Sequence, residues 1–339
     1  MIIFQIIETI PNTIHKIAPL APNRYKQSIM ILNPSDILLK DDKEIELIEI
    51  LKAIEKFWDA RLGERYIAVY NEETKSYWPR NSSGNYQGLV SVDYAVKRSL
   101  NTVVVNLCEE MGIDAVYSNM LSYGYTTLAD HDVRGDGKVL TDRGTAPLAL
   151  GGLTYGVTVR EHTQAYATLA NKGTTSKART YSIVRDSTGK VILENNEEHS
   201  VKYQEATTAT LTNMLTHVVE NGTAAGIVNF GFKYGVKVAG KTGTTSDKKD
   251  VYFSGYTPDF VGCCWYGYDN NKAITAGGNP AASLWNAVFD EIYKYYHENQ
   301  ISYKTAFDIP DSIVKVKVCA VSGKLAVEGV CDHDAYSGN

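Results

Sequence analysis

The residues best suited to chemistry lie at the end of one predicted strand, where a lysine is followed by hydroxyl side chains and a glycine. Val236 and Val238 alternate with their neighbours in the pattern of a half-buried strand. Gly243 has no side chain, so the backbone of a ligand can lie against the strand at that point. The sequence therefore predicts a strand edge that binds a carboxylate, formed by these residues: Lys241, Thr242, Gly243, Thr244 and Thr245.

A serine and an asparagine lie upstream, where one predicted helix ends and the next begins. The first helix is expected over 92–98 and the second over 102–111, which places Ser99 and Asn101 at the break. Two residues at such a break can face the same cleft, whereas in mid-helix they would diverge. A serine two residues before an asparagine is common and equally fits a helix cap. We expect both to converge with Lys241 on one anion-accepting cleft.

The elements that must hold these residues are strands and amphipathic helices. The segments 251–256 and 260–268 are predicted to continue the sheet after Lys241. A helix around 211–219 has one apolar face and is expected to pack beneath that sheet. A last helix is predicted over 281–298, with these residues facing inward: Trp285, Val288, Phe289, Ile292 and Tyr296.

Three stretches of the chain together resemble the transpeptidase domain of class A penicillin-binding proteins. They are Gly240-Lys241-Thr242-Gly243-Thr244-Thr245, Phe253-Ser254-Gly255-Tyr256-Thr257-Pro258-Asp259 and Trp265-Tyr266-Gly267-Tyr268-Asp269. The Trp78-Pro79-Arg80-Asn81 connector is similar to the same family. The resemblance implies an α+β fold, in which an antiparallel sheet is flanked by helices and accompanied by a helical subdomain, as in β-lactamases and transpeptidases.

The resemblance covers roughly residues 66–331 and suggests three parts. Residues 1–65 are expected to form a divergent segment with one amphipathic helix from about Asp41 to Leu62, and nothing before about residue 41 is similar to the family. Residues 66–310 correspond to the penicillin-binding transpeptidase domain, and residues 311–339 form a C-terminal tail. The chain is thus expected to be an N-terminally incomplete member of the family.

The resemblance also implies roles for the candidate residues. Ser99 would pass protons beside Lys241, and Asn101 would hydrogen-bond the amide of the substrate. The hydroxyls of Thr242 and Thr244 would hold the carboxylate of a D-alanyl peptide or a β-lactam, and the backbone N–H of Thr244 would supply one oxyanion donor. The implied activity is serine-type transpeptidation in peptidoglycan biosynthesis, an acyl transfer of the bacterial cell wall.

The serine nucleophile that this chemistry requires is missing where the family places it. A serine should begin a helix some sixty residues before Ser99, with a lysine one turn later. The corresponding segment, about Lys43 to Glu46, contains no serine. Formal Ser-x-x-Lys matches occur only in a hairpin turn, a loop and the C-terminal strand: Ser187/Lys190, Ser246/Lys249 and Ser312/Lys315. We therefore expect a catalytically incomplete chain that forms no covalent β-lactam adduct.

Several interpretations remain open from the sequence alone. The chain is either an incomplete product that has lost the membrane helix, glycosyltransferase domain and nucleophile segment of a class A protein, or a non-catalytic relic that still folds. It can also be a non-enzymatic module that binds peptidoglycan stem peptides or a protein partner. A β-lactamase or D,D-carboxypeptidase of the same superfamily is disfavoured, because the connector at 78–81 and the tail from Cys319 to Cys331 resemble the polymerising enzymes.

Charge and composition limit the partners further. The formal net charge is -5 with mixed signs, so there is no basic stripe for a nucleic acid. The acidic spacing in 130–142 does not match a calcium loop, and we expect neither a metal nor a cofactor. The family acts on the outer face of the bacterial cytoplasmic membrane, but Met1 to Ile7 is too short to span a bilayer and no signal is evident. Whether Cys319 and Cys331 are bridged is left open.

Overall fold

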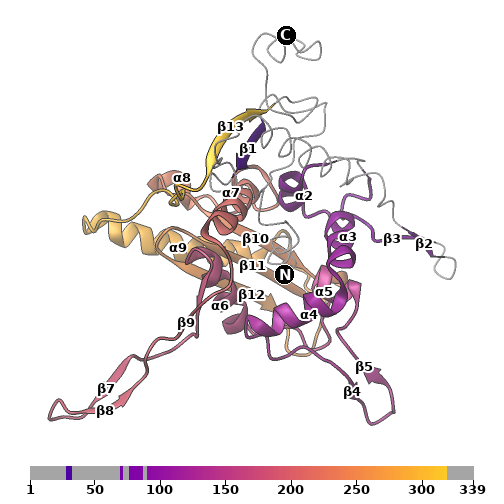
Figure 1. The fold of residues 1–339 in the computed structure, drawn as a ribbon, viewed down its shortest axis with the longest axis horizontal. Coiled ribbons are helices and arrows are strands. Elements are labelled where there is room, and N and C mark those ends of the chain that lie inside the picture. The colour runs from indigo at the N-terminus through magenta and orange to yellow at the C-terminus, as the bar shows by residue number, and fades with distance from the viewer. Residues whose placement is uncertain (1–27, 33–68, 72–75, 87–89, 319–339) are drawn as a thin grey trace, which may run out of the picture.

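The central sheet of the computed structural model is antiparallel, with the strand order β10–β11–β12 (Figure 1). The strands are β10 (Ala239–Thr244), β11 (Asp250–Tyr256) and β12 (Val261–Gly267). Lys241 lies opposite Ser254 in the register. Within the residues that the structure describes, namely 28–32, 69–71, 76–86 and 90–318, β10 is an edge strand of this sheet.

Helices cover both faces of the sheet. On one side lie α6 (Val159–Ala170) and α7 (Glu205–Asn221), and on the other lies α9 (Pro280–Glu298) (Figure 1). α7 packs beneath β10, as the apolar face of the helix predicted. Trp285 of α9 lies under β12 and donates from Nε1 to the carbonyl of Gly262 at 2.9 Å.

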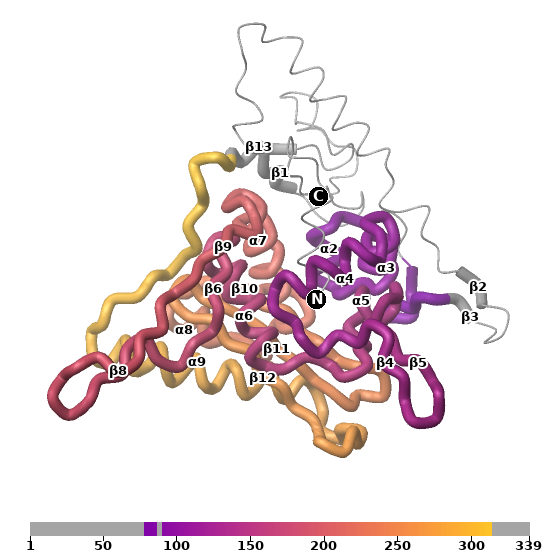
Figure 2. The backbone as a smooth tube through the Cα atoms, turned by 60° about the horizontal axis from the view of Figure 1, so that its bottom comes forward, coloured from indigo at the N-terminus to yellow at the C-terminus, as the bar shows by residue number. Residues whose placement is uncertain are grey.

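A group of short helices lies beside the β10 edge and forms the helical subdomain, as Figure 2 shows. The helices of this group are α2 (Val92–Arg98), α3 (Asn101–Met111), α4 (Ile113–Ser122) and α5 (Thr145–Leu150). α2 begins where Ser91 Oγ accepts from the backbone N–H of Tyr94 at 3.0 Å, so Ser91 is the N-cap of this helix. One buried apolar cluster extends from these helices into the sheet and its covering helices.

Two hairpins project from the body of the molecule in both overall views (Figures 1 and 2). They are β4–β5 (Asp132–Val133 and Val139–Leu140) and β7–β8 (Ile183–Arg185 and Val191–Glu194). β7 and β8 pair antiparallel, so Ser187 lies in a hairpin turn, as expected from the sequence. The remaining elements are β1 (Ser28–Leu32), β2 (Val69–Asn71), β3 (Ser76–Trp78), β6 (Thr174–Ser176), β9 (His199–Val201), α8 (Phe230–Tyr234), a 3-10 turn (Ser246–Lys248) and β13 (Val314–Val318).

The observed architecture confirms the predicted α+β fold, with one correction in the last helix. Val288 was predicted to face inward, but it is 47 % exposed. Tyr293, which was not predicted, is completely buried. The buried stripe of α9 runs through Trp285, Phe289 and Tyr293, four residues apart, and Val288 lies off that line.

Some predictions fall on residues that the structure does not describe. These are the helix at 41–62, the segment Lys43–Glu46, and Cys319 with Cys331. Among the described helices, none combines the length and apolar character needed to cross a membrane.

Candidate active site

The two predicted motifs meet through one hydrogen bond. Lys241 Nζ donates to Ser99 Oγ at 2.8 Å, across 142 residues of sequence, and to the carbonyl of Thr242 at 2.9 Å. Lys241 reaches Ser99 because it points to the face of β10 that looks toward α7 and the helical subdomain. The ammonium and the hydroxyl thus lie together beside β10, the edge strand of the described sheet.

Ser99 is positioned by the way α2 ends. It is the C-cap of that helix and adopts a left-handed conformation, with φ 55° and ψ 52°. The N–H of Leu100 then donates back to the carbonyl of Ala95 at 2.9 Å, which closes the helix end. A left-handed serine costs about 1 kcal/mol or more, and such strained residues concentrate at functional sites. The turn directs the serine hydroxyl toward β10 and starts α3 at Asn101.

Burial controls the charge of the lysine. It lowers the pKa of Lys241 from its ordinary value to about 8. At neutral pH the amine is therefore mostly protonated, yet roughly a tenth of it is neutral. A lysine in this state can hold an anion electrostatically and can also exchange a proton with the adjacent hydroxyl of Ser99.

Asn101 is held by the connector that precedes the helical subdomain. Its Nδ2 donates to the carbonyl of Arg80 at 2.7 Å, which leaves one amide hydrogen and the carbonyl oxygen for a ligand. Asn81 supports the same junction, because its Oδ1 accepts from the backbone N–H and the hydroxyl of Thr102 at 3.2 and 3.3 Å. Sequence reasoning noted this connector only as a resemblance and missed its positioning role.

The residues after Lys241 have different surroundings. Thr244 is exposed at the edge of the sheet. Among the described residues, a Cβ at Gly243 would have a single neighbour within 4 Å, Tyr252 Cβ at 3.4 Å. The hydroxyl of Thr245 accepts from the N–H of Asp250 at 2.8 Å and so closes the β10–β11 turn. The ligand-binding roles of these residues stay predictions.

Two further contacts, which were not predicted, join α7 and the turn after it to α2 and β10. His217 Nδ1 of α7 lies 2.5 Å from Asp93 Oδ1 of α2, and this hydrogen bond raises the pKa of His217 above its ordinary value. Thr223, just beyond α7, lies with its hydroxyl 2.7 Å from that of Thr242. Each contact joins residues far apart in sequence, so no local pattern could have revealed it.

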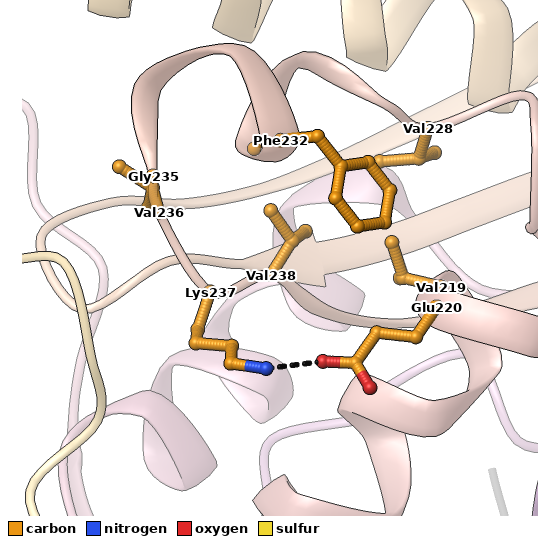
Figure 3. A pocket seen from close by; sticks show the side chains of 9 residues that line it. Val219, Glu220, Val228, Phe232, Gly235, Val236, Lys237 and Val238 are labelled. Carbon is orange, nitrogen blue, oxygen red and sulfur yellow. Dashed lines mark hydrogen bonds and ion pairs between the residues drawn. The ribbon is translucent and has the colours of Figure 1, made fainter.

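A small cavity lies beside the residues that precede β10, and it is separate from Ser99, Asn101 and Lys241. It measures about 240 Å³ and is lined largely by valines and by Phe232 of α8. Lys237 and Glu220 also line it, as Figure 3 shows, and their side chains form an ion pair of 2.6 Å. None of the predicted site residues lines this cavity. We therefore place the site by its hydrogen bonds and not by the cavity.

Acidic residues near the β4–β5 hairpin form hydrogen bonds and an ion pair within the fold. Asp142 is fully buried, and its carboxylate accepts from the N–H of Ala129 and from the N–H and hydroxyl of Thr154, each at 2.8 Å. Asp130 pairs with Arg143. Within the described part of the chain, no three His, Cys, Asp or Glu side chains are grouped to hold a metal ion.

Comparison with known proteins identifies the family. Residues 64–294 match the model of the penicillin binding protein transpeptidase domain. The chain therefore belongs to the penicillin-binding protein transpeptidase family.

Relatives and solved structures agree with this assignment. Penicillin-binding protein 1A of Clostridium botulinum (strain Langeland) is 34% identical over 254 residues, covering 74% of this chain and 28% of that protein. Penicillin-binding protein 4 of Bacillus subtilis is 29% identical, covering 65% and 33%. This chain thus spans a third or less of the length of these relatives.

The structural neighbours show the same fold. Penicillin-Binding Protein 1A from Haemophilus influenzae has a TM-score of 0.59 and 17% identity, covering 79% of this chain and 43% of the other. PonA1 of Mycobacterium tuberculosis, solved in complex with penicillin V, has a TM-score of 0.52 and 21% identity, covering 74% and 69%.

Proposed function

We propose that these residues form the substrate-binding part of a penicillin-binding D,D-transpeptidase, which cross-links peptidoglycan stem peptides through an acyl-enzyme. The observation that carries the proposal is the 2.8 Å hydrogen bond between Lys241 Nζ and Ser99 Oγ. Each motif alone is a short sequence that occurs by chance. Their meeting beside an open strand edge supports a common catalytic cleft.

In the described part of the chain β10 has no strand along its outer edge, and this edge suits an extended peptide that ends in a carboxylate. Such a peptide can add to a sheet edge through backbone hydrogen bonds. In this proposal the hydroxyls of Thr242 and Thr244 bind the terminal carboxylate near the Lys241 ammonium, and Asn101 donates its second amide hydrogen to the substrate. The N–H of Thr244 serves as an oxyanion donor, and Ser99 and Lys241 transfer protons.

This chain is proposed to bind without acylating. The acyl step needs a hydroxyl nucleophile, and the segment expected to provide it, about Lys43 to Glu46, contains no serine. D-Alanyl peptides and β-lactams are then noncovalent ligands of this chain. By analogy with the family, the site of action is the outer face of the bacterial cytoplasmic membrane.

Covalent labelling tests the incomplete chemistry directly. The chain is incubated with a fluorescent penicillin and separated by denaturing electrophoresis, beside a penicillin-binding protein that has its serine. We expect no labelled band from this chain. A band that disappears on mutation of any one serine would show that the chain acylates.

Noncovalent binding tests the substrate class. The chain is titrated with N-acetyl-D-alanyl-D-alanine and, as a control, with the L,L dipeptide, while backbone amide NMR signals are followed. We expect weak saturable shifts at Gly243 and Thr244 with the D,D dipeptide and smaller shifts with the L,L dipeptide. Equal responses to both, or none, would favour a module that binds a protein partner.

A further inference from the structure

The turn that follows α7 is fixed against two motif-bearing elements at once. The N–H of Thr223 donates to the carbonyl of Lys97 in α2 at 3.2 Å, and its hydroxyl lies 2.7 Å from Thr242 Oγ1 in β10. One turn earlier, Glu220 pairs with Lys237 at 2.6 Å, at the entrance to β10 (Figure 3). Thr223 therefore sits where the helix carrying Ser99 meets the strand carrying Lys241.

The close approach depends on the glycine before this threonine. A Cβ at Gly222 would lie 2.7 Å from the Lys97 carbonyl oxygen and 2.6 Å from Val218 Cα, and both are backbone atoms. A side chain at position 222 would therefore push the turn away from α2. Gly222 allows Thr223 to reach Thr242. Of the two paired threonines, Thr223 is exposed and Thr242 is half-buried.

Either hydroxyl of this pair can be the hydrogen-bond donor, and the direction decides whether Thr242 can donate to an anionic ligand. Each hydroxyl has one hydrogen to donate. If Thr242 donates to Thr223, the Thr242 oxygen presents only lone pairs to a ligand. If Thr223 donates to Thr242, the Thr242 hydrogen is available to a carboxylate, and the hydrogen bond it accepts strengthens the one it donates.

We propose that Thr223 is a positioning residue that donates to Thr242 and directs the Thr242 hydroxyl hydrogen toward the terminal carboxylate of a D-alanyl peptide. This inference rests on the proposed function, because it requires the β10 edge to bind that carboxylate. Thr223 itself acts through Thr242. Replacing Thr223 should therefore change the affinity for a peptide that ends in a carboxylate and leave the affinity for the uncharged amide unchanged.

The test compares two ligands and three forms of the chain. The ligands are N-acetyl-D-alanyl-D-alanine and its C-terminal amide, which differ only in the anionic group. The proteins are the unaltered chain, Thr223→Val, which has the same shape without the hydroxyl, and Thr223→Ser, which restores it. Affinities come from amide NMR titrations, and a thermal melt of each variant confirms that it folds.

We expect the unaltered chain to prefer the carboxylate ligand. Thr223→Val should reduce that preference about fivefold, the range for one hydrogen bond to a ligand, and leave affinity for the amide unchanged. Thr223→Ser should return the preference to within about twofold of the original. Thr223→Ala serves in place of the valine variant if the latter does not fold.

Other outcomes separate the two proposals. If the unaltered chain shows no preference for the carboxylate, the proposed function fails and this inference fails with it. If the preference exists and survives in Thr223→Val, only the role of Thr223 is wrong. An equal loss of affinity for both ligands, or no rescue by serine, would mean that Thr223 supports the fold alone.

Discussion

The two faces of the β10–β12 sheet have contrasting chemistry. On the α9 side, Trp285 packs against Phe253 at a ring-centroid distance of 5.0 Å and stacks on Phe289 at 3.7 Å. On the α6 and α7 side, the buried groups include the Tyr256–Thr212 hydroxyl pair, at 2.7 Å. Strand alternation sends Lys241 to this second, polar face. One face is thus packed with aromatic rings, and the other carries buried hydroxyls and the lysine of the candidate site.

Replacing Trp285 with alanine should cause the largest loss of stability, because its side chain is 1 % exposed and fills the aromatic face. We expect the free energy of unfolding to fall by about 3–5 kcal/mol in urea denaturation. Leu284→Ala, one position away and 52 % exposed, is the control and should change it by about 0.5 kcal/mol or less. A loss below about 1 kcal/mol for the tryptophan variant would contradict the distinction between the faces.

Replacing Lys241 with methionine should separate binding from stability on the polar face. Loss of a charged donor should weaken binding of N-acetyl-D-alanyl-D-alanine roughly tenfold or more. The free energy of unfolding should stay equal or rise, because burial disfavours the ammonium in the folded chain. Lys233→Met is the control for both measurements, because this lysine of α8 is 58% exposed and pairs with Asp290 at the surface; it should leave binding unchanged and alter the free energy of unfolding by about 1 kcal/mol or less.

The pH dependence of the unaltered chain should report the same lysine. Because the pKa of Lys241 is about 8, affinity for the dipeptide should fall as pH rises from 7 to 9. The folded pKa lies below the unfolded value, so the unfolded chain binds more protons between about pH 8 and 10.5. The lysine therefore makes the free energy of unfolding rise with pH in that window. In Lys241→Met, dipeptide titrations should show no fall in affinity from pH 7 to 9. Thermal melts of the two proteins should show that the variant lacks the lysine's contribution to the rise in free energy of unfolding.

Sequence patterns predicted the elements better than the contacts between them. The Thr158–Glu161 capping box can be recognised from the sequence, because its reciprocal hydrogen bonds join residues three apart. The aromatic residues of α9 fit more than one choice of buried helix face, and Val288 was placed on the inward one. The packing of α9 against β11 and β12 decides the face, and the sequence does not show that packing.

The candidate site shows the same limit. Ser99, Asn101 and the β10 residues could be chosen because short motifs and a family resemblance mark them. His217 and Thr223 could not be chosen in this way, since their partners lie 124 and 19 residues away and depend on how α2, α7 and β10 pack. Local patterns identify a motif residue, whereas its supports follow from the fold.

Removing the hydroxyl of Tyr256 should test the buried polar pair on the same face. Tyr256→Phe leaves the Thr212 hydroxyl without its partner, and we expect a loss of about 1–2 kcal/mol in the free energy of unfolding. The matched double variant Tyr256→Phe with Thr212→Val removes both polar groups and should recover part of that loss. Strictly additive losses would show that the two hydroxyls do not interact.

The smallest expected effect concerns the link between α7 and α2. The hydrogen bond to Asp93 raises the pKa of His217, while burial and the nearby Lys97 lower it and Glu220 raises it further. Because the folded pKa exceeds the unfolded one, the stabilisation is complete below about pH 6.5 and is lost as pH rises through the folded value.

The variant His217→Gln keeps a hydrogen-bonding side chain beside Asp93 but cannot become charged. Its deficit in free energy of unfolding relative to the unaltered chain should be about 1 kcal/mol at pH 5.5 and should shrink toward zero at pH 8.5. Urea denaturation of both proteins at the two pH values gives this deficit. Groups that titrate equally in the two proteins do not contribute to it, because the deficit is a difference between them. A deficit that is constant with pH would show that the imidazole packs between the helices without contributing through its charge, and the contact would then belong with the apolar supports of the fold.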